Sequence, residues 1–296
     1  MLRGRLGLET SRVPQTDRHG LLWVARGRLS AEDGTLRFVT TGGGDLSPGD
    51  YAIPFQMLSA VMLGPGTSVT HDALRLLARH GCALVAVGED GVRFYAGMPF
   101  GNDDSALARR HARAWADPTE RSRIARRLYA WRLGEVLPDA DIAVLRGIEG
   151  ARMKESYRLL AQQYGLEWRG RRYDRNAPES ADLPNQAINH VVTAVESAAM
   201  LAVALTGAIP SLGFIHEDSG NAFTLDVTDL FRDTVTLPTA FGAVRECQQD
   251  VAKSGMNIER VARRAAGRVL REKKVVPTMI DRIKEVLRAD DGGGDA

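Results

Sequence analysis

The spacing of the apolar residues changes once along this chain, near Ser105, and this change limits the folds open to it. Before Ser105 the apolar residues stand in short runs between turn-forming residues, and beyond it they recur at helical spacing. A period of about two favours strands and a period of about 3.6 favours helices. We therefore predict an α+β chain with a small β-rich domain at residues 1–100, a larger all-α domain at residues 101–289 and a disordered Gly- and Asp-rich tail at residues 290–296.

Strand signals fill the N-terminal part. Two apolar runs, Leu21–Val24 and Leu36–Val39, lie on either side of Glu32-Asp33-Gly34 and predict a β-hairpin. One short helix is predicted between Thr70 and Arg79. Further strands are predicted at Tyr51–Phe55, Ser59–Leu63, Cys82–Val87 and Val92–Tyr95, with the last two joined at Glu89-Asp90-Gly91.

Helix start and stop signals mark the C-terminal part. Asp117-Pro118 predicts a helix start, because proline fits the first helical position. Gly165 is expected to close a helix that begins at Pro138-Asp139. Longer helices are predicted at about Asn185–Leu205, Ile258–Arg271 and Pro277–Leu287.

The composition is that of an ordinary soluble protein, with 44% hydrophobic and 26% charged residues. No uninterrupted apolar run approaches the ~18 residues that span a bilayer, and the N-terminus is charged. We expect a cytoplasmic protein without a membrane partner. Cys82 and Cys247 are too few for a disulfide scaffold, so both are expected to be buried free thiols.

Charge is unevenly distributed along the chain. Residues 105–180 hold 16 Lys/Arg and 10 Asp/Glu (net +6), residues 181–250 hold 2 and 9 (net −7), and residues 251–288 hold 11 and 4 (net +7). An acidic block between two basic ones suits a cation site within a phosphate-binding surface. Solvated helix faces are the alternative explanation for such runs.

The familiar catalytic motifs are missing from this sequence. It has no dinucleotide-binding glycine fingerprint, no Walker loop and no nucleophile elbow. Gly42-Gly43-Gly44 is predicted to be a turn, because no helix follows it. Cys82 lies in an apolar strand segment, where a reactive thiolate is not expected.

Glu149 stands out because it lies on a predicted helix between Gly147 and Gly150. Two glycines in a helix cost roughly 1 kcal/mol each relative to alanine, so we expect another group to approach the backbone there. A carboxylate on the apolar side of a helix is costly unless it is paired or binds a metal. A helical ion pair with Arg146 or Arg152 is the simpler alternative.

His216, Asp226 and Asp229 form a second polar group. His216 follows the apolar stretch 212–215 and is placed to face a cleft, with a hydrogen-bonded core histidine as the alternative. Asp226 and Asp229 are three residues apart on one helical face, where like charges repel unless a cation lies between them. Asp226 has a second interpretation as a helix N-cap.

These residues are candidates for one metal site. Carboxylate oxygens favour Mg²⁺ or Mn²⁺, and a single imidazole inclines the choice toward Mn²⁺. A structural zinc site would call for cysteines or more histidines. Such an ion can neutralise a phosphate oxygen and activate the attacking oxygen of an in-line displacement.

Four stretches occur in the order and spacing of a known family. By these stretches the chain resembles the CRISPR-associated adaptation integrase family, in the branch that serves the type I-E system. The resemblance covers most of the chain up to about Phe241. The stretches are Leu145–Gly150, Tyr164–Asp174, Gly213–His216 and Asp226–Leu230.

The resemblance implies a metal-dependent DNA endonuclease/integrase that inserts short double-stranded DNA fragments into the CRISPR repeat array. The fragment's 3′-hydroxyl would attack a repeat phosphodiester. The N-terminal domain would be β-sandwich-like and the C-terminal domain helical. The chain would form a homodimer, with the N-terminal domain taking part in dimerisation and DNA contact, and would assemble with a small second CRISPR adaptation protein. The implied metal ligands are Glu149, His216 and Asp229, with Asp226 as a further catalytic residue, and the implied DNA-phosphate contacts are Arg93, Arg146 and Arg232.

One departure limits this transfer. Glu196 stands where a relative has a tyrosine in the long helix, so no DNA contact is carried over to that position. Two alternatives stay open from the residues alone. One is a structure-selective, metal-dependent nuclease acting on branched DNA, and the other is a non-enzymatic nucleic-acid-binding scaffold.

Overall fold

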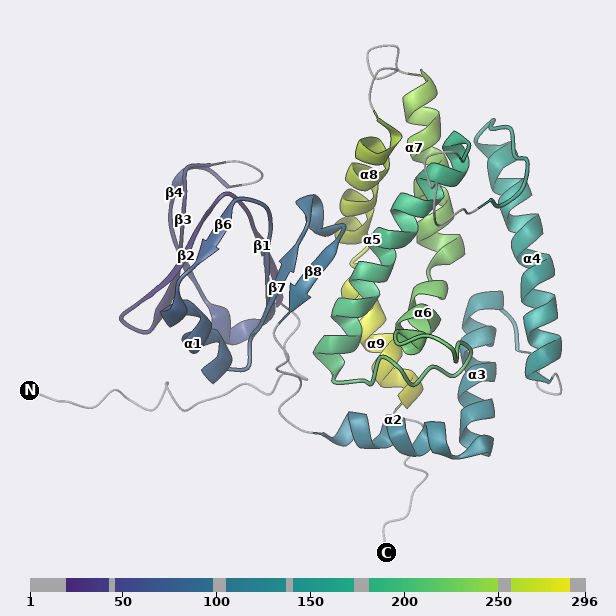
Figure 1. The fold of residues 1–296 in the computed structure, drawn as a ribbon, viewed down its shortest axis with the longest axis horizontal. Helices are drawn as coiled ribbons and strands as arrows, with labels where there is room; N and C mark the ends of the chain where they lie inside the picture. The colour runs from purple at the N-terminus through teal and green to yellow at the C-terminus, as the bar shows by residue number, and fades with distance from the viewer. Residues whose placement is uncertain are drawn as a thin grey trace, which may run out of the picture. The chain divides into compact units, whose positions relative to one another are not determined.

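The computed structural model describes residues 20–42, 46–97, 105–136, 141–172, 181–249 and 257–287. The chain divides into two compact units, Met1–Ser105 and Ala106–Ala296 (Figure 1). The first is built mainly of strands and the second of helices, which confirms the predicted α+β class. The expected tail at residues 290–296 and the expected helix start at Pro138-Asp139 lie outside the described residues.

Two four-stranded sheets form most of the N-terminal unit. One has the strand order β1-β5-β7-β8 and the other β4-β3-β2-β6. The predicted short helix is α1 (His71–Arg79), and its N-cap is Thr70, whose side chain accepts the N–H of Ala73. The strands are β1 (Gly20–Val24), β2 (Gly27–Glu32), β3 (Thr35–Thr40), β4 (Gly49–Ile53), β5 (Leu58–Leu63), β6 (Thr67–Val69), β7 (Ala83–Val87) and β8 (Phe94–Gly97).

The predicted hairpin has a different first strand. β3 pairs antiparallel with β2, and the two-residue loop Asp33-Gly34 has positive φ at both positions (49° and 76°), as a tight hairpin loop requires. The segment Leu21–Val24 instead pairs parallel with β5 in the other sheet. That part of the prediction was wrong, because the apolar pattern of a strand does not specify which strand it pairs with.

Both sheets and α1 contribute to one core in this unit. Leu29 and Phe38 from one sheet, Val61 from the other and Leu77 from α1 are all buried in a single cluster. Burial of large apolar side chains between two sheets is the source of stability in a β-sandwich. The β-sandwich-like character predicted for this unit is therefore present.

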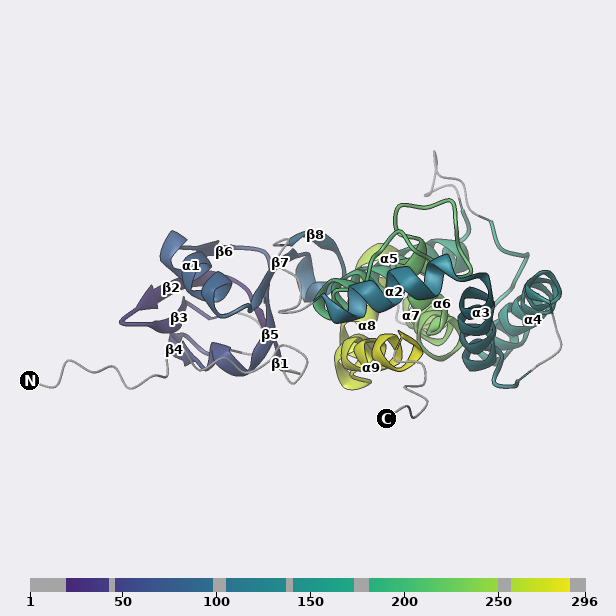
Figure 2. The same ribbon diagram turned by 90° about the horizontal axis from the view of Figure 1, so that it is seen from below.

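Helix α5 (Leu183–Thr206) is the centre of the C-terminal unit, and α6, α7, α8 and α9 pack against it (Figures 1 and 2). The start at Asp117 is confirmed, since its carboxylate accepts the N–H groups of Thr119 and Glu120. Gly165 follows the end of α4 with φ of 68°, as predicted. The other helices are α2 (Ala106–Ala116), α3 (Pro118–Leu133), α4 (Ile142–Gln163), α6 (Ala222–Asp229), α7 (Leu237–Gln249), α8 (Ile258–Glu272) and α9 (Val275–Leu287).

Among the described residues, α5 is the one helix long and apolar enough to cross a membrane. Of the 18 residues in the most apolar stretch of α5, 61% are buried inside the protein. A helix that is apolar on most sides belongs in a protein core when other helices surround it. The packing of α6 to α9 around α5 therefore explains its composition.

Cys82 and Cys247 are both buried thiols that form no disulfide, as expected.

Candidate functional site

Three separate elements of the C-terminal unit bring the predicted ligands together. Glu149 lies on α4, Asp229 is the last residue of α6, and His216 lies in the loop before α6. The Nε2 atom of His216 is 3.9 Å from Oδ2 of Asp229. Glu149 and Asp229 are linked through a residue that the sequence did not single out, Arg132 near the end of α3.

Arg132 bridges the two carboxylates. Its Nη2 lies 2.6 Å from Oε1 of Glu149, and its Nη1 donates to Oδ2 of Asp229 at 2.8 Å. The side chain of Arg132 is 4% exposed. The partner of Glu149 is therefore an arginine from another helix, and the alternative pairing of Glu149 with Arg146 or Arg152 is wrong.

Asp226 holds the loop that carries His216. Its Oδ2 accepts the N–H groups of Phe214 (2.6 Å) and Ile215 (3.1 Å), and its Oδ1 accepts the N–H of His216 (3.0 Å). Nδ1 of His216 contacts the same Oδ1 at 2.7 Å. Asp226 lies inside α6, whose N-cap is Asn221, so the N-cap interpretation is wrong.

These contacts fix the orientation of the His216 ring. A carboxylate can only accept hydrogen bonds, so Nδ1 carries a proton, and in the neutral ring Nε2 keeps its lone pair on the side of Asp229. The hydrogen bond to Asp226 raises the pKa of His216 more than burial lowers it. Asp226 therefore acts through His216, in the way that outer carboxylates orient metal-binding histidines.

Asp229 has both of its oxygens engaged. Oδ2 accepts from Arg132, and Oδ1 accepts from Nη2 of Arg232. Burial alone would lower the pKa of the Arg232 guanidinium, but the attraction and hydrogen bonds of Asp229 and Tyr157 raise it. Arg232, predicted to contact DNA, is thus held beside Asp229 and helps to fix it.

The two glycines beside Glu149 face open space. A Cβ atom added at Gly147 or Gly150 would meet nothing within 4 Å. The expectation that another part of the protein approaches the backbone there is not met by any described residue. Both glycines are exposed to solvent on α4 instead.

The loop that precedes α6 is anchored from α2. The fully buried ring of His111 bonds through Nε2 to the carbonyl of Leu212 (2.7 Å), and its Nδ1 accepts the N–H of Ile209 (3.1 Å). Burial lowers the pKa of His111, which keeps this ring neutral. Nε1 of Trp115 donates to the carbonyl of Gly213 at 2.9 Å. Sequence reasoning missed this anchor.

The other predicted DNA contacts lie in different surroundings. Arg146 on α4 is exposed, and its Nη2 donates to the carbonyl of Ile215 at 3.3 Å, next to His216. Arg93 belongs to the N-terminal unit and precedes β8. Of the three arginines, Arg232 therefore contacts a carboxylate of the candidate site, and Arg146 contacts the loop that carries His216.

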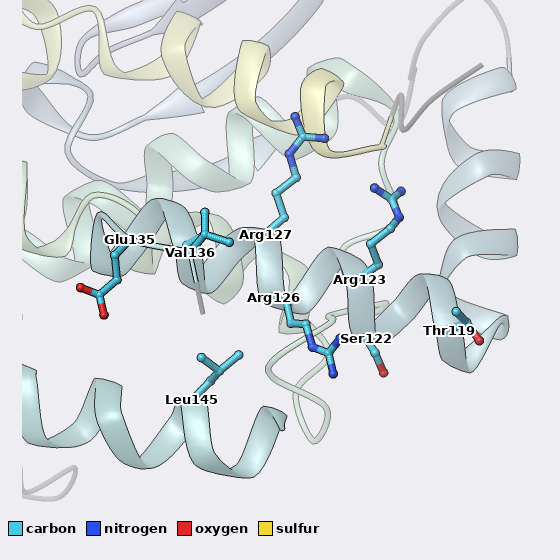
Figure 3. A pocket seen from close by; sticks show the side chains of 9 residues that line it. Thr119, Ser122, Arg123, Arg126, Arg127, Glu135, Val136 and Leu145 are labelled. Atoms are coloured by element: carbon cyan, nitrogen blue, oxygen red, sulfur yellow. The ribbon is translucent and has the colours of Figure 1, made fainter. Parts of the chain in front are cut away.

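A cavity of about 740 Å³ lies between α3 and the start of α4 (Figure 3). Figure 3 shows Arg126 extending into the space between the two helices. Arg123 pairs with Glu120, and Arg127 pairs with Glu285. Three arginines and one glutamate line the cavity, so its lining is basic, and Leu145 in its wall is one helical turn from Glu149. Its lining is Thr119, Ser122, Arg123, Arg126, Arg127, Ala130, Glu135, Val136 and Leu145.

Comparisons with known proteins give a consistent result. The family model described as "CRISPR associated protein Cas1" matches residues 21–137 and 132–259. The chain is 35% identical over 285 residues to a CRISPR-associated endonuclease Cas1 of Geobacter sulfurreducens, covering 96% of this chain and 88% of the relative. It is 33% identical to the Escherichia coli protein of the same description, covering 94% and 87%.

A solved structure of a TtCas1–DNA complex is also similar to this chain. The TM-score is 0.80 at 31% sequence identity, covering 93% of this chain and 98% of the other. Sequence and fold thus agree over nearly the whole length, including both units. The chain belongs to the Cas1 family of CRISPR-associated proteins.

Proposed function

We propose that this chain is a metal-dependent DNA endonuclease/integrase of CRISPR adaptation, which inserts short double-stranded DNA fragments as new spacers into the repeat array. The observation that carries the proposal is the convergence of Glu149, His216 and Asp229 beside a buried cation, in a chain of the Cas1 family. The names and the DNA complex of its relatives support DNA as the substrate. We place the chain in the type I-E branch on the four motifs described above.

The donor set of the site suits Mg²⁺ or Mn²⁺. Glu149 and Asp229 supply carboxylate oxygens, and His216 supplies a nitrogen lone pair that already faces Asp229. The place between the two carboxylates already attracts a positive group, since the Arg132 guanidinium lies there. A bound ion would neutralise the attacked phosphate and activate the attacking oxygen.

The protein's own residues prepare this chemistry. Asp226 orients His216, and Arg232 fixes one oxygen of Asp229. Arg146 is exposed beside the His216 loop, where it can bind a phosphate without reading sequence.

In the reaction, the fragment's 3′-oxygen forms a bond to the phosphorus of a repeat phosphodiester. The bond from that phosphorus to its original 3′-oxygen breaks. The attacking hydroxyl loses its proton to solvent, and the leaving 3′-oxygen takes up a proton from solvent to become a free 3′-hydroxyl. One phosphodiester replaces another, so no external energy source is needed.

The assembly that we propose is a homodimer that binds a small second CRISPR adaptation protein in the cytoplasm. Exposed apolar side chains on the N-terminal unit, Val39, Met57 and Tyr95, support a role of this unit in protein contacts. Light scattering on the purified chain, alone and with the second protein, measures both associations.

A strand-transfer assay tests the function. A short duplex with free 3′-hydroxyls is mixed with a supercoiled plasmid that carries a repeat, the protein and its small partner, in Mn²⁺, Mg²⁺ or chelator. Joining that needs metal and is lost in His216→Ala supports the proposal. Cleavage without joining favours a nuclease of branched DNA, and binding without any reaction favours a scaffold.

A further inference from the structure

We infer that Arg132 is an internal counter-cation that closes the metal site in the metal-free protein and competes with the divalent ion for Glu149 and Asp229. The inference rests on the proposed function, because it presumes that these residues bind a metal. It assigns a positioning role to a residue outside the proposed ligand set.

Arg132 and a divalent ion at this site would need the same oxygen atom, Oδ2 of Asp229. Oδ1 of Asp229 is held by Arg232, which leaves Oδ2 for any ion that Asp229 and His216 bind together. That same Oδ2 is 2.8 Å from Nη1 of Arg132 and 3.9 Å from Nε2 of His216. An ion placed between Asp229 and His216 must therefore take this oxygen from Arg132.

Glu149 leads to the same conclusion. Its Oε1 is 2.6 Å from Nη2 of Arg132, so the guanidinium spans the gap between both carboxylates. In the part of the chain that the structure describes, no group of three or more His, Cys, Asp or Glu is arranged to hold a metal. Arg132 occupies the place that such an ion would need.

The burial of Arg132 gives a second, independent argument. Ile124 and Leu128 are buried at i and i+4 of α3, and Arg132 continues the same stripe at i+8 with only 4% of its side chain exposed. Its Nε is buried and has no hydrogen-bond partner among the described residues. A buried cation left partly unpaired is costly, so the two carboxylates determine where it sits.

It follows that Arg132 must leave Glu149 and Asp229 when the divalent ion binds. Without a cation, Glu149 and Asp229 would repel each other, and Arg132 prevents this in the metal-free protein. Binding of the ion breaks two hydrogen bonds between charged groups, which weakens metal binding relative to a site that is already open. It also releases the guanidinium from its buried position.

Metal affinity tests this directly. Binding of Mn²⁺ is titrated by electron paramagnetic resonance in the wild type, Arg132→Gln, Arg132→Lys and Arg127→Gln. We expect Arg132→Gln to bind Mn²⁺ at least about tenfold tighter than the wild type, and Arg132→Lys to lie between them. Arg127→Gln is the matched control, since it removes an arginine–glutamate pair from the same helix without touching the site.

A second measurement uses the unchanged protein and decides the matter if Arg132→Gln does not fold. Phenylglyoxal modifies accessible arginines, and peptide mass spectrometry reports the modified fraction at each position. We expect Arg132 to be protected without metal and to become reactive when Mn²⁺ saturates the protein. Arg232, which stays on Asp229, serves as the reference.

The outcomes separate this inference from the proposed function. Mn²⁺ binding that is lost in His216→Ala but unchanged or weaker in Arg132→Gln overturns the role of Arg132 and leaves the metal site intact. Continued protection of Arg132 in the Mn²⁺-loaded protein overturns it as well. Absence of Mn²⁺ binding in every variant contradicts the proposed metal site and, with it, the inference.

Discussion

Asp226→Asn separates the orientation of His216 from the charge of the proposed ligands. In the wild type, Oδ2 of Asp226 accepts the backbone N–H groups of Phe214 and Ile215, while Oδ1 accepts the backbone N–H and the Nδ1–H of His216. An asparagine has only one accepting oxygen, so it can serve one of these pairs and not both. The substitution keeps the size of the side chain, changes its hydrogen bonding and removes its negative charge, while the charges of Glu149 and Asp229 stay unchanged.

We expect the new amide to keep its oxygen on Phe214 and Ile215 and to turn its NH₂ group toward Nδ1 of His216. The ring proton then moves to Nε2, where it blocks metal binding. The N–H of His216 loses its acceptor, which lowers the free energy of unfolding by about 2 kcal/mol. Loss of the orienting partner lowers Mn²⁺ affinity roughly 10- to 100-fold.

The tautomer of His216 can be determined by ¹⁵N NMR. Long-range ¹H–¹⁵N correlations at about pH 9, above the ordinary imidazole pKa of about 6.5, report which ring nitrogen of His216 carries the proton. His111 is an internal reference, since its Nε2–H and acceptor Nδ1 do not depend on Asp226 for their partners. An unchanged Nδ1–H tautomer of His216 in Asp226→Asn would refute the reasoning.

Three further predictions concern the surroundings of the site. Arg146→Gln should weaken DNA binding and lower the slope of log binding constant against log salt concentration by about one, as measured by filter binding over a salt series. It should cost less than about 0.5 kcal/mol of the free energy of unfolding in urea. An unchanged slope argues against a phosphate contact. Gly150→Ala should stabilise the protein by about 1 kcal/mol in urea unfolding, because the added methyl group meets open space, and a loss of stability would contradict this. Burial lowers the pKa of His111, so the unfolded chain binds the proton more readily, and the free energy of unfolding falls as the pH drops below about 6.5. His111→Gln should make the free energy of unfolding less dependent on pH in this range. An equally steep dependence in the variant would rule out His111 as its source.

Much of the fold could be predicted because it is encoded locally. The helix after Thr70, the start at Asp117 and the end at Gly165 follow from capping chemistry within a few residues of each boundary. The hairpin error at Leu21–Val24 arose because strand pairing is a long-range choice. Parallel pairing of β1 with β5 depends on the whole sandwich and not on either strand alone.

The candidate ligands could be found from their residue types, but their partners could not. Glu149 pairs with Arg132, which lies on a different helix, whereas local spacing offered only Arg146 and Arg152. One signal was present in the sequence: Arg132 continues the buried stripe of Ile124 and Leu128 at intervals of four. An arginine in an apolar stripe predicts a buried acidic partner, and only the fold shows which one it is.

Anomalous diffraction from a crystal soaked in Mn²⁺ tests the central claim most directly. We expect an anomalous peak bounded by Glu149, Nε2 of His216 and Oδ2 of Asp229, with Asp226 still bonded to Nδ1 of His216. A peak elsewhere on the protein, or a saturated crystal with no peak at these three side chains, would contradict it.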